Sequence, residues 1–276
     1  MVAPQLQSVR TPDGGVLSVY SYGTGPGAVL AAGSLTRTIL YSTFASSLSA
    51  TIPVHVYDRR GRGKSSPLPA DYSMDAELDD LKAVLDATGS SVVLGHSYGG
   101  GIALEAALCL PVSRVAVYDP AVNIAGCLPT RMLPELIEAA AKGDYVRAVQ
   151  AFSREIDPRV QKTVLPDQAV RLVLWAISRM TKDGRAWKEM VPALAQEIAL
   201  LDSSHPASTR YAGIAVPVLL LAGADSPDYF HTIAASLAAS LASSTSVIVP
   251  RSSHGALQHP SGMIVNLFRR FLRQEA

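Results

Sequence analysis

Short, continuously apolar runs recur along the chain, each stopped by turn residues, and they constrain the fold more than any other feature. They are residues 28–32, 54–57, 92–94, 115–118, 218–221 and 247–249. A strand that is apolar throughout is covered on both faces, which is typical of a parallel sheet. A further run at 16–20 alternates apolar and polar residues, as a half-buried strand does. We therefore expect a mostly parallel sheet.

Helical patterns fill the gaps between these runs. In the segment from Met74 to Thr88, Leu78, Leu81, Val84 and Leu85 fall on one stripe and the acidic residues lie elsewhere. Strands that alternate with amphipathic helices build a three-layer α/β fold with right-handed crossovers.

The alternation stops after Asp119. Residues 131–201 carry only helical patterns, at 134–142, 144–156, 166–180 and 186–201, and strand patterns resume at 217–221. We therefore expect an α/β core made of residues 1–120 and 214–276. Residues 121–213 should form an inserted helical unit, which we call the cap. It should roof the carboxyl ends of the strands, where open parallel sheets bind ligands.

The sequence Gly95-His96-Ser97-Tyr98-Gly99 has the form G-x-S-x-G. It directly follows the apolar run and opens a helical stretch at 100–108. A strand, a sharp turn and a helix are the context of a nucleophile elbow, and the glycines give the turn the room it needs. We predict that Ser97 is a nucleophile, with the backbone N–H of Tyr98 as one oxyanion donor.

A serine hydroxyl needs a base to take its proton, and the base needs a third group to orient it. Of the six histidines, His254 is best placed as the base because it lies in a turn after the last apolar run. Asp225, just past the run at 218–221, is our first choice of acid. Asp119, at the end of the preceding run, and Asp228, at an expected helix start, are the alternatives. His96 should point away from Ser97 and pack or hydrogen-bond.

Three further segments resemble the α/β-hydrolase fold superfamily, and the likeness covers nearly the whole chain. Residues 57–66 resemble its D-x-R-G-x-G-x-S stretch, residues 224–226 its acid turn, and residues 253–255 its histidine loop. The resemblance implies a Ser97, Asp225 and His254 triad. It also implies that Ser34 supplies the second oxyanion N–H, although Ala32 and Gly33 stand where the family usually has His-Gly.

Competing motifs do not fit. Gly63-Lys64-Ser65 ends like a phosphate-binding loop, but the glycine required earlier is replaced by Asp58. No set of His, Asp and Glu has metal-ligand spacing, so we expect neither a metal nor a cofactor. Four basic residues should lie on a solvated loop with structural ion pairs. They are Arg59, Arg60, Arg62 and Lys64.

Charge and composition narrow the class of partner. With 24 basic and 23 acidic residues the net charge is +1, which argues against nucleic acid or an anionic membrane as the main partner. Residues 1–8 lack a secretory signal pattern, and no apolar stretch approaches the ~18 residues of a membrane span. The two cysteines, Cys109 and Cys127, form no disulfide framework. We expect a cytoplasmic protein with a small-molecule substrate, and a homodimer stays open.

Together these features predict a serine hydrolase that cleaves a carboxylic ester, thioester or lactone through an acyl-enzyme on Ser97. Aromatic and thioether side chains in the cap favour a small to medium apolar substrate. They are Trp175, Trp187, Met132, Met180 and Met190. The alternative is a non-hydrolytic enzyme on the same scaffold, such as a lyase, a cofactor-free perhydrolase or a tailoring or cyclising enzyme. A hydrolase-like binding module is a third hypothesis.

Overall fold

The computed structural model describes residues 3–156, 160 and 163–273. Eight strands form one sheet in the order β1-β2-β4-β3-β5-β6-β7-β8. They are β1 (Gln5–Arg10), β2 (Val16–Tyr22), β3 (Ala28–Ala31), β4 (Val54–Asp58), β5 (Val92–His96), β6 (Arg114–Tyr118), β7 (Val218–Gly223) and β8 (Ser244–Val249). From β4 to β8 the strands run parallel, and β2 and β1 add an antiparallel edge. The expected sheet is confirmed. Only β1, which is mostly exposed, was not predicted.

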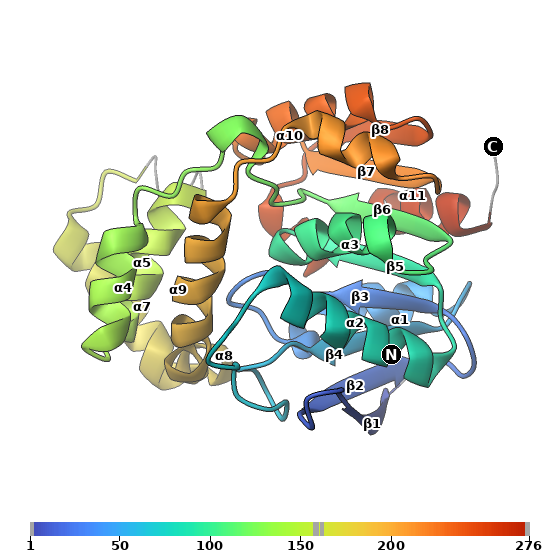
Figure 1. Ribbon diagram of the computed structural model, residues 1–276. Coiled ribbons are helices and arrows are strands. Elements are labelled where there is room, and N and C mark those ends of the chain that lie inside the picture. The colour runs from blue at the N-terminus through green and yellow to red at the C-terminus, as the bar shows by residue number, and fades with distance from the viewer. Residues whose placement is uncertain (1–2, 157–159, 161–162, 274–276) are drawn as a thin grey trace.

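Helices cover both faces of the sheet (Figure 1). One face packs against α2 (Met74–Thr88), α3 (Tyr98–Cys109) and α10 (Asp228–Ser240), and the other against α1 (Ser42–Leu48) and α11 (Gly262–Arg273). Neighbouring residues of one strand therefore enter different clusters: Val93 packs in the first and Leu94 in the second. This two-sided burial explains why the strands are apolar throughout.

Local signals set the helix ends. Helix α2 begins after Ser73, whose hydroxyl accepts a hydrogen bond from the N–H of Ala76 at 3.2 Å, and ends at Gly89, which has φ 65°. A serine N-cap and a left-handed glycine at the C-cap are common helix boundaries. Within the described residues, short 3-10 helices lie in four connections. They are η1 (Thr38–Tyr41), η2 (Ile124–Gly126), η3 (Ser208–Gly213) and η4 (His254–Leu257).

The helices between β6 and β7 stand together beside the sheet in Figure 1, with α9 between the sheet and the other helices. They are α4 (Leu133–Ala141), α5 (Tyr145–Ile156), α7 (Asp167–Met180), α8 (Lys182–Arg185) and α9 (Trp187–Ser203). Leu136, Phe152 and Leu194 are among the residues that pack in a core of their own. The four helices predicted in this segment are present, and α8 adds a short turn. None of the helices in the described ranges combines the length and the apolar character that crossing a bilayer requires.

Candidate active site

Ser97 occupies the sharp turn between β5 and α3. Its backbone has φ 53° and ψ −122°, a conformation that L residues rarely adopt. Two backbone hydrogen bonds hold the turn: the Ser97 N–H donates to the Tyr118 carbonyl at 3.1 Å, and the Ser97 carbonyl accepts from the Ala121 N–H at 2.8 Å. A Cβ on Gly99 would lie 2.1 Å from the Ala31 carbonyl oxygen, so only glycine fits there. The predicted strand, turn and helix are thus present around Ser97.

His254 is paired with a buried carboxylate. Its Nδ1 lies 3.0 Å from Oδ2 of Asp119, whose side chain is fully buried. The same carboxylate accepts the Gly223 N–H at 3.0 Å and the Ser226 hydroxyl at 2.6 Å. Because an ionised carboxylate only accepts, Nδ1 of His254 carries a proton and its Nε2 is left as an acceptor. This is the tautomer that a general base needs when it takes a proton from a serine.

The structure corrects our choice of acid. Asp225 was predicted to orient His254, but it is exposed, and no side-chain hydrogen bond of Asp225 occurs among the described residues. Asp119, one of the two alternatives, makes that contact instead. Both aspartates follow neighbouring strands, and the register of β6 against β7 brings Asp119 to the histidine and carries Asp225 past it. Asp228 begins α10, as expected.

The histidine loop is fixed over the ends of β5 and β6. His96 and Tyr118 are register partners on these strands. The Nε2 of His96 lies 2.8 Å from the His254 carbonyl oxygen, and the Tyr118 hydroxyl donates to the Ser253 carbonyl at 2.9 Å. The Phe230 ring stacks on the His254 ring with centroids 4.6 Å apart. His254 is therefore held beside the edge from which Ser97 and Asp119 project.

Within the described part of the chain, no hydrogen bond joins the Ser97 hydroxyl to His254, whose side chain bonds to Asp119. Catalytic hydrogen bonds are often long or poorly aligned without substrate, and they tighten in the Michaelis complex.

His96 has the hydrogen-bonding role that its place in the elbow predicted. Since a carbonyl only accepts, Nε2 donates to His254, and Nδ1 accepts from the Tyr41 hydroxyl at 2.7 Å. Burial first, and then the charge of His254, lower the pKa of His96 to about 3, so the ring is neutral near pH 7. The Tyr41 hydroxyl also accepts the Gly33 N–H at 3.0 Å. No motif in the sequence indicates this series of hydrogen bonds from Gly33 to His254.

The two candidate oxyanion donors belong to residues close to Ser97. Ser34 and Ser97 line the same cavity, and a Cβ on Gly33 would lie 3.1 Å from the Ser97 Cβ. No hydrogen bond within the described residues uses the Ser34 N–H. Tyr98 is the first residue of α3, so its N–H has no partner inside the helix. Both N–H groups are therefore available to an anion.

The cavity at Ser97 is small, about 40 Å³, and none of the described residues that line it has a charged side chain. Apart from Ser34, Ser97 and Thr130, its lining residues are Ala121, Leu128, Pro129, Met132, Phe152, Ile156, Ile198, Leu201, Tyr229 and Phe230. Of the aromatic and thioether residues that we predicted from the cap sequence, Met132 lines it. Trp175 and Met180 are instead exposed on α7, by 50% and 78%.

The basic cluster is buried rather than solvated, which corrects our expectation for three of its four members. Arg59, Arg60 and Arg62 are 0%, 7% and 2% exposed, and only Lys64 faces solvent. The predicted ion pairs exist: Arg59 Nη1 lies 2.5 Å from Glu77, and Arg62 contacts Glu197 of α9. These acidic partners are remote in sequence, so a local pattern of charges could not reveal the burial.

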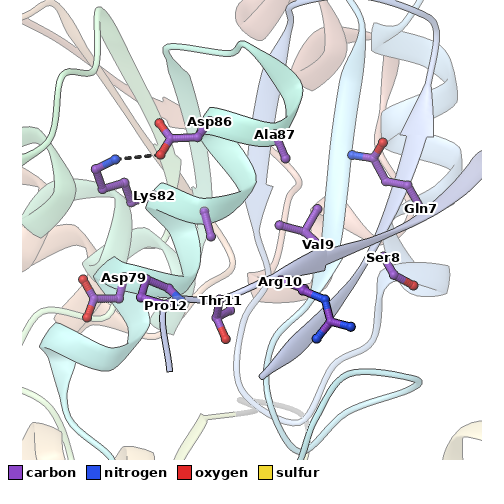
Figure 2. Close-up of a pocket in the computed structure, with 11 residues that line it drawn as sticks. Gln7, Ser8, Val9, Arg10, Thr11, Pro12, Asp79, Lys82, Asp86 and Ala87 are labelled. Atoms are coloured by element: carbon purple, nitrogen blue, oxygen red, sulfur yellow. Dashed lines mark hydrogen bonds and ion pairs between the residues drawn. The ribbon is translucent and has the colours of Figure 1, made fainter. Parts of the chain in front are cut away.

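Hollows elsewhere in the described residues are less suited to catalysis than the Ser97 cavity. A hollow of about 710 Å³ lies between β1 and α2, with an ion pair of Lys82 and Asp86 at its edge (Figure 2). It contains no residue predicted to act in catalysis. No group of three or more His, Cys, Asp and Glu within the described ranges is arranged to hold a metal ion.

Comparison with known proteins agrees with this fold. The sequence profile of the alpha/beta hydrolase family matches residues 26–266. Lipase LipV of Mycobacterium tuberculosis is 30% identical over 155 residues, which are 52% of this chain and 54% of the lipase. The chain thus spans about half the length of that relative.

Solved structures extend the likeness to the whole fold. An alpha/beta hydrolase from Sphaerobacter thermophilus has a TM-score of 0.76 and 26% identity, with 95% of this chain and all of that chain covered. An esterase from Exiguobacterium antarcticum also has a TM-score of 0.76, at 17% identity, covering 98% of this chain and 100% of its own. The esterase likeness at this identity concerns the fold alone.

Proposed function

The chain belongs to the alpha/beta hydrolase family, and on this premise we propose that it cleaves a carboxylic ester, thioester or lactone through an acyl-enzyme on Ser97. The pairing of His254 with the buried Asp119, beside a serine on a strained turn, carries the proposal. The similarity to a lipase supports ester cleavage.

In the proposed reaction, His254 Nε2 takes the proton of the Ser97 hydroxyl as the oxygen attacks the acyl carbon. Asp119 holds the imidazole in the required tautomer and stabilises it when it becomes charged. The backbone N–H groups of Ser34 and Tyr98 stabilise the oxyanion. His254 then gives its proton to the leaving group. Water, activated by the same imidazole, hydrolyses the acyl-enzyme.

The cavity suggests the class of acyl group. A water needs roughly 10–15 Å³ on this measure, so a cavity of about 40 Å³ accepts only a few heavy atoms. The described residues of its lining are uncharged and mostly apolar, so a charged acyl chain would lose its hydration without gaining a charged partner among them. We therefore propose that short, neutral acyl groups are preferred over long or anionic ones.

Labelling of Ser97 tests this function directly. A fluorophosphonate should add once to the wild-type protein, as seen by intact mass, and not to Ser97→Ala. In a series of p-nitrophenyl esters, acetate and butyrate should be cleaved faster than longer chains, and Ser97→Ala should lose almost all of this activity. Folded wild-type protein that neither labels nor hydrolyses these esters would instead favour the non-hydrolytic alternative.

A further inference from the structure

We propose that Glu197, carried by cap helix α9, is a positioning residue for the oxyanion hole. Through Arg59 it fixes the orientation of the Gly33–Ser34 peptide. This inference rests on the proposed function and adds a role for the cap in the chemistry, beyond lining the cavity.

The first step is the contact between the cap and the core. The Glu197 side chain is fully buried, and its Oε1 lies 2.8 Å from Arg59 Nη2 and also contacts Arg62. Burial alone would raise the pKa of Glu197. The charges of Arg59 and Arg62, with a hydrogen bond from the Ser34 hydroxyl, instead hold it below its usual range. Glu197 is therefore ionised where it pairs with the two arginines.

The second step leads from Arg59 to the loop. Arg59 Nε donates to the Ala32 carbonyl at 3.0 Å, and Nη2 donates to the Gly33 carbonyl at 3.3 Å. The Thr36 hydroxyl donates to the same Gly33 carbonyl at 2.7 Å. The Gly33 carbonyl is thus held by two buried donors.

The third step is the geometry of the peptide bond. A trans peptide is planar, so the C=O of Gly33 and the N–H of Ser34 point in opposite directions. Holding the carbonyl toward Arg59 and Thr36 therefore turns the Ser34 N–H away from them. Ser34 also lines the cavity of Ser97, into which this N–H would have to point in order to meet an oxyanion. The Gly33 carbonyl and the Ser34 N–H therefore turn together, so a contact that fixes the carbonyl also fixes the direction of the N–H.

The fourth step is the balance of charge around Arg59. Its guanidinium lies between two carboxylates, Glu77 of α2 and Glu197 of α9, and 4.8 Å above the Tyr98 ring. A buried arginine stays in place only where its charge is paired. Without the charge of Glu197, attraction toward Glu77 is unopposed, and the hydrogen bond to Gly33, at 3.3 Å the longer of the two carbonyl contacts, is weakened first.

The test compares Glu197→Gln with Glu138→Gln. Glu138 also lies in the cap and forms ion pairs, with Lys142 and Arg147, but on the exposed side of α4. Active sites are counted with a fluorophosphonate, and kcat and KM are measured for p-nitrophenyl acetate. The inhibition constant of an alkylboronic acid is measured in parallel, because its tetrahedral adduct places an oxygen in the oxyanion hole.

For Glu197→Gln we expect kcat per active site to fall about 10–100-fold, somewhat less than loss of a whole oxyanion donor, with KM within about threefold. Boronic acid affinity should fall in parallel. Glu197→Asp should recover part of the loss, and Glu138→Gln should behave as wild type.

An unchanged kcat per titrated site in Glu197→Gln, even with a lower melting temperature, would show a purely structural role and overturn the inference. If that variant does not fold, Thr36→Val decides the matter. It removes the other side-chain donor to the Gly33 carbonyl, and it too must lower kcat and boronic acid affinity together. A wild-type protein that fails to label refutes the proposed function instead. Boronic acid binding to wild type and variant is then still a separate readout of the oriented N–H.

Discussion

The Ser97 cavity has two sides that are built in opposite ways. We call the ends of β5 and β6 its floor, and the lining residues from the helices between β6 and β7 its roof. On the floor, at the ends of β5 and β6, Asp119 and His96 have defined hydrogen-bond partners for their polar atoms. The roof presents apolar side chains such as Phe152 and Ile198. Hydrogen bonds are directional, whereas apolar burial is not. Changes in the floor should therefore affect the chemical step, and changes in the apolar residues of the roof should affect which substrate fits.

The largest effect is expected at the acid. Asp119→Asn should lower kcat for p-nitrophenyl acetate by about 10²–10⁴-fold, because an amide can stabilise the wrong imidazole tautomer. The matched change Asp225→Asn should leave kcat within about twofold, since that side chain is exposed. Equal losses in the two variants would contradict the assignment made from the structure.

Next in size is a pH dependence of stability that belongs to the floor. The folded pKa of His96, about 3, lies below the unfolded value of 6.5, so the unfolded chain binds more protons between these values. This contribution to stability is complete above pH 6.5 and is lost as the pH falls, by up to about 1.4 kcal/mol per unit.

His96→Asn should remove that slope. Urea unfolding of wild type and variant between pH 7 and about pH 5 measures the difference, and the other titrating groups cancel in the comparison. Parallel pH profiles for the two proteins would show that His96 is not buried as a neutral ring.

The smallest effect on the chemistry is expected in the roof. Phe152→Ala removes a ring that lines the cavity, so longer acyl chains should gain several-fold in kcat/KM relative to acetate. The substitution should also cost about 3–5 kcal/mol of stability, since it opens a cavity in the cap core. An unchanged chain-length profile in the folded variant would mean that Phe152 does not limit the acyl site.

Much of the site could be predicted from local sequence because its signals are local. Ser97 lies in a motif whose turn needs small neighbours, and His254 lies in a loop after the last strand. The acid was harder to predict, because Asp119 and Asp225 follow neighbouring strands and both fit the order serine, acid, histidine along the chain. The ion cluster was missed for a related reason: Arg59 meets Glu77 and Glu197 only after two helices have packed against the sheet.

By itself, the sequence determined the parallel sheet, the place of the inserted helices and the turn that exposes Ser97. These depend on hydrophobic periodicity and on backbone preferences of a few adjacent residues. Only the tertiary structure decided which carboxylate bonds to His254 and which residue of α9 pairs with Arg59 and Arg62. Such contacts depend on strand register and helix packing, and a shift of a few ångströms there exchanges one polar partner for another.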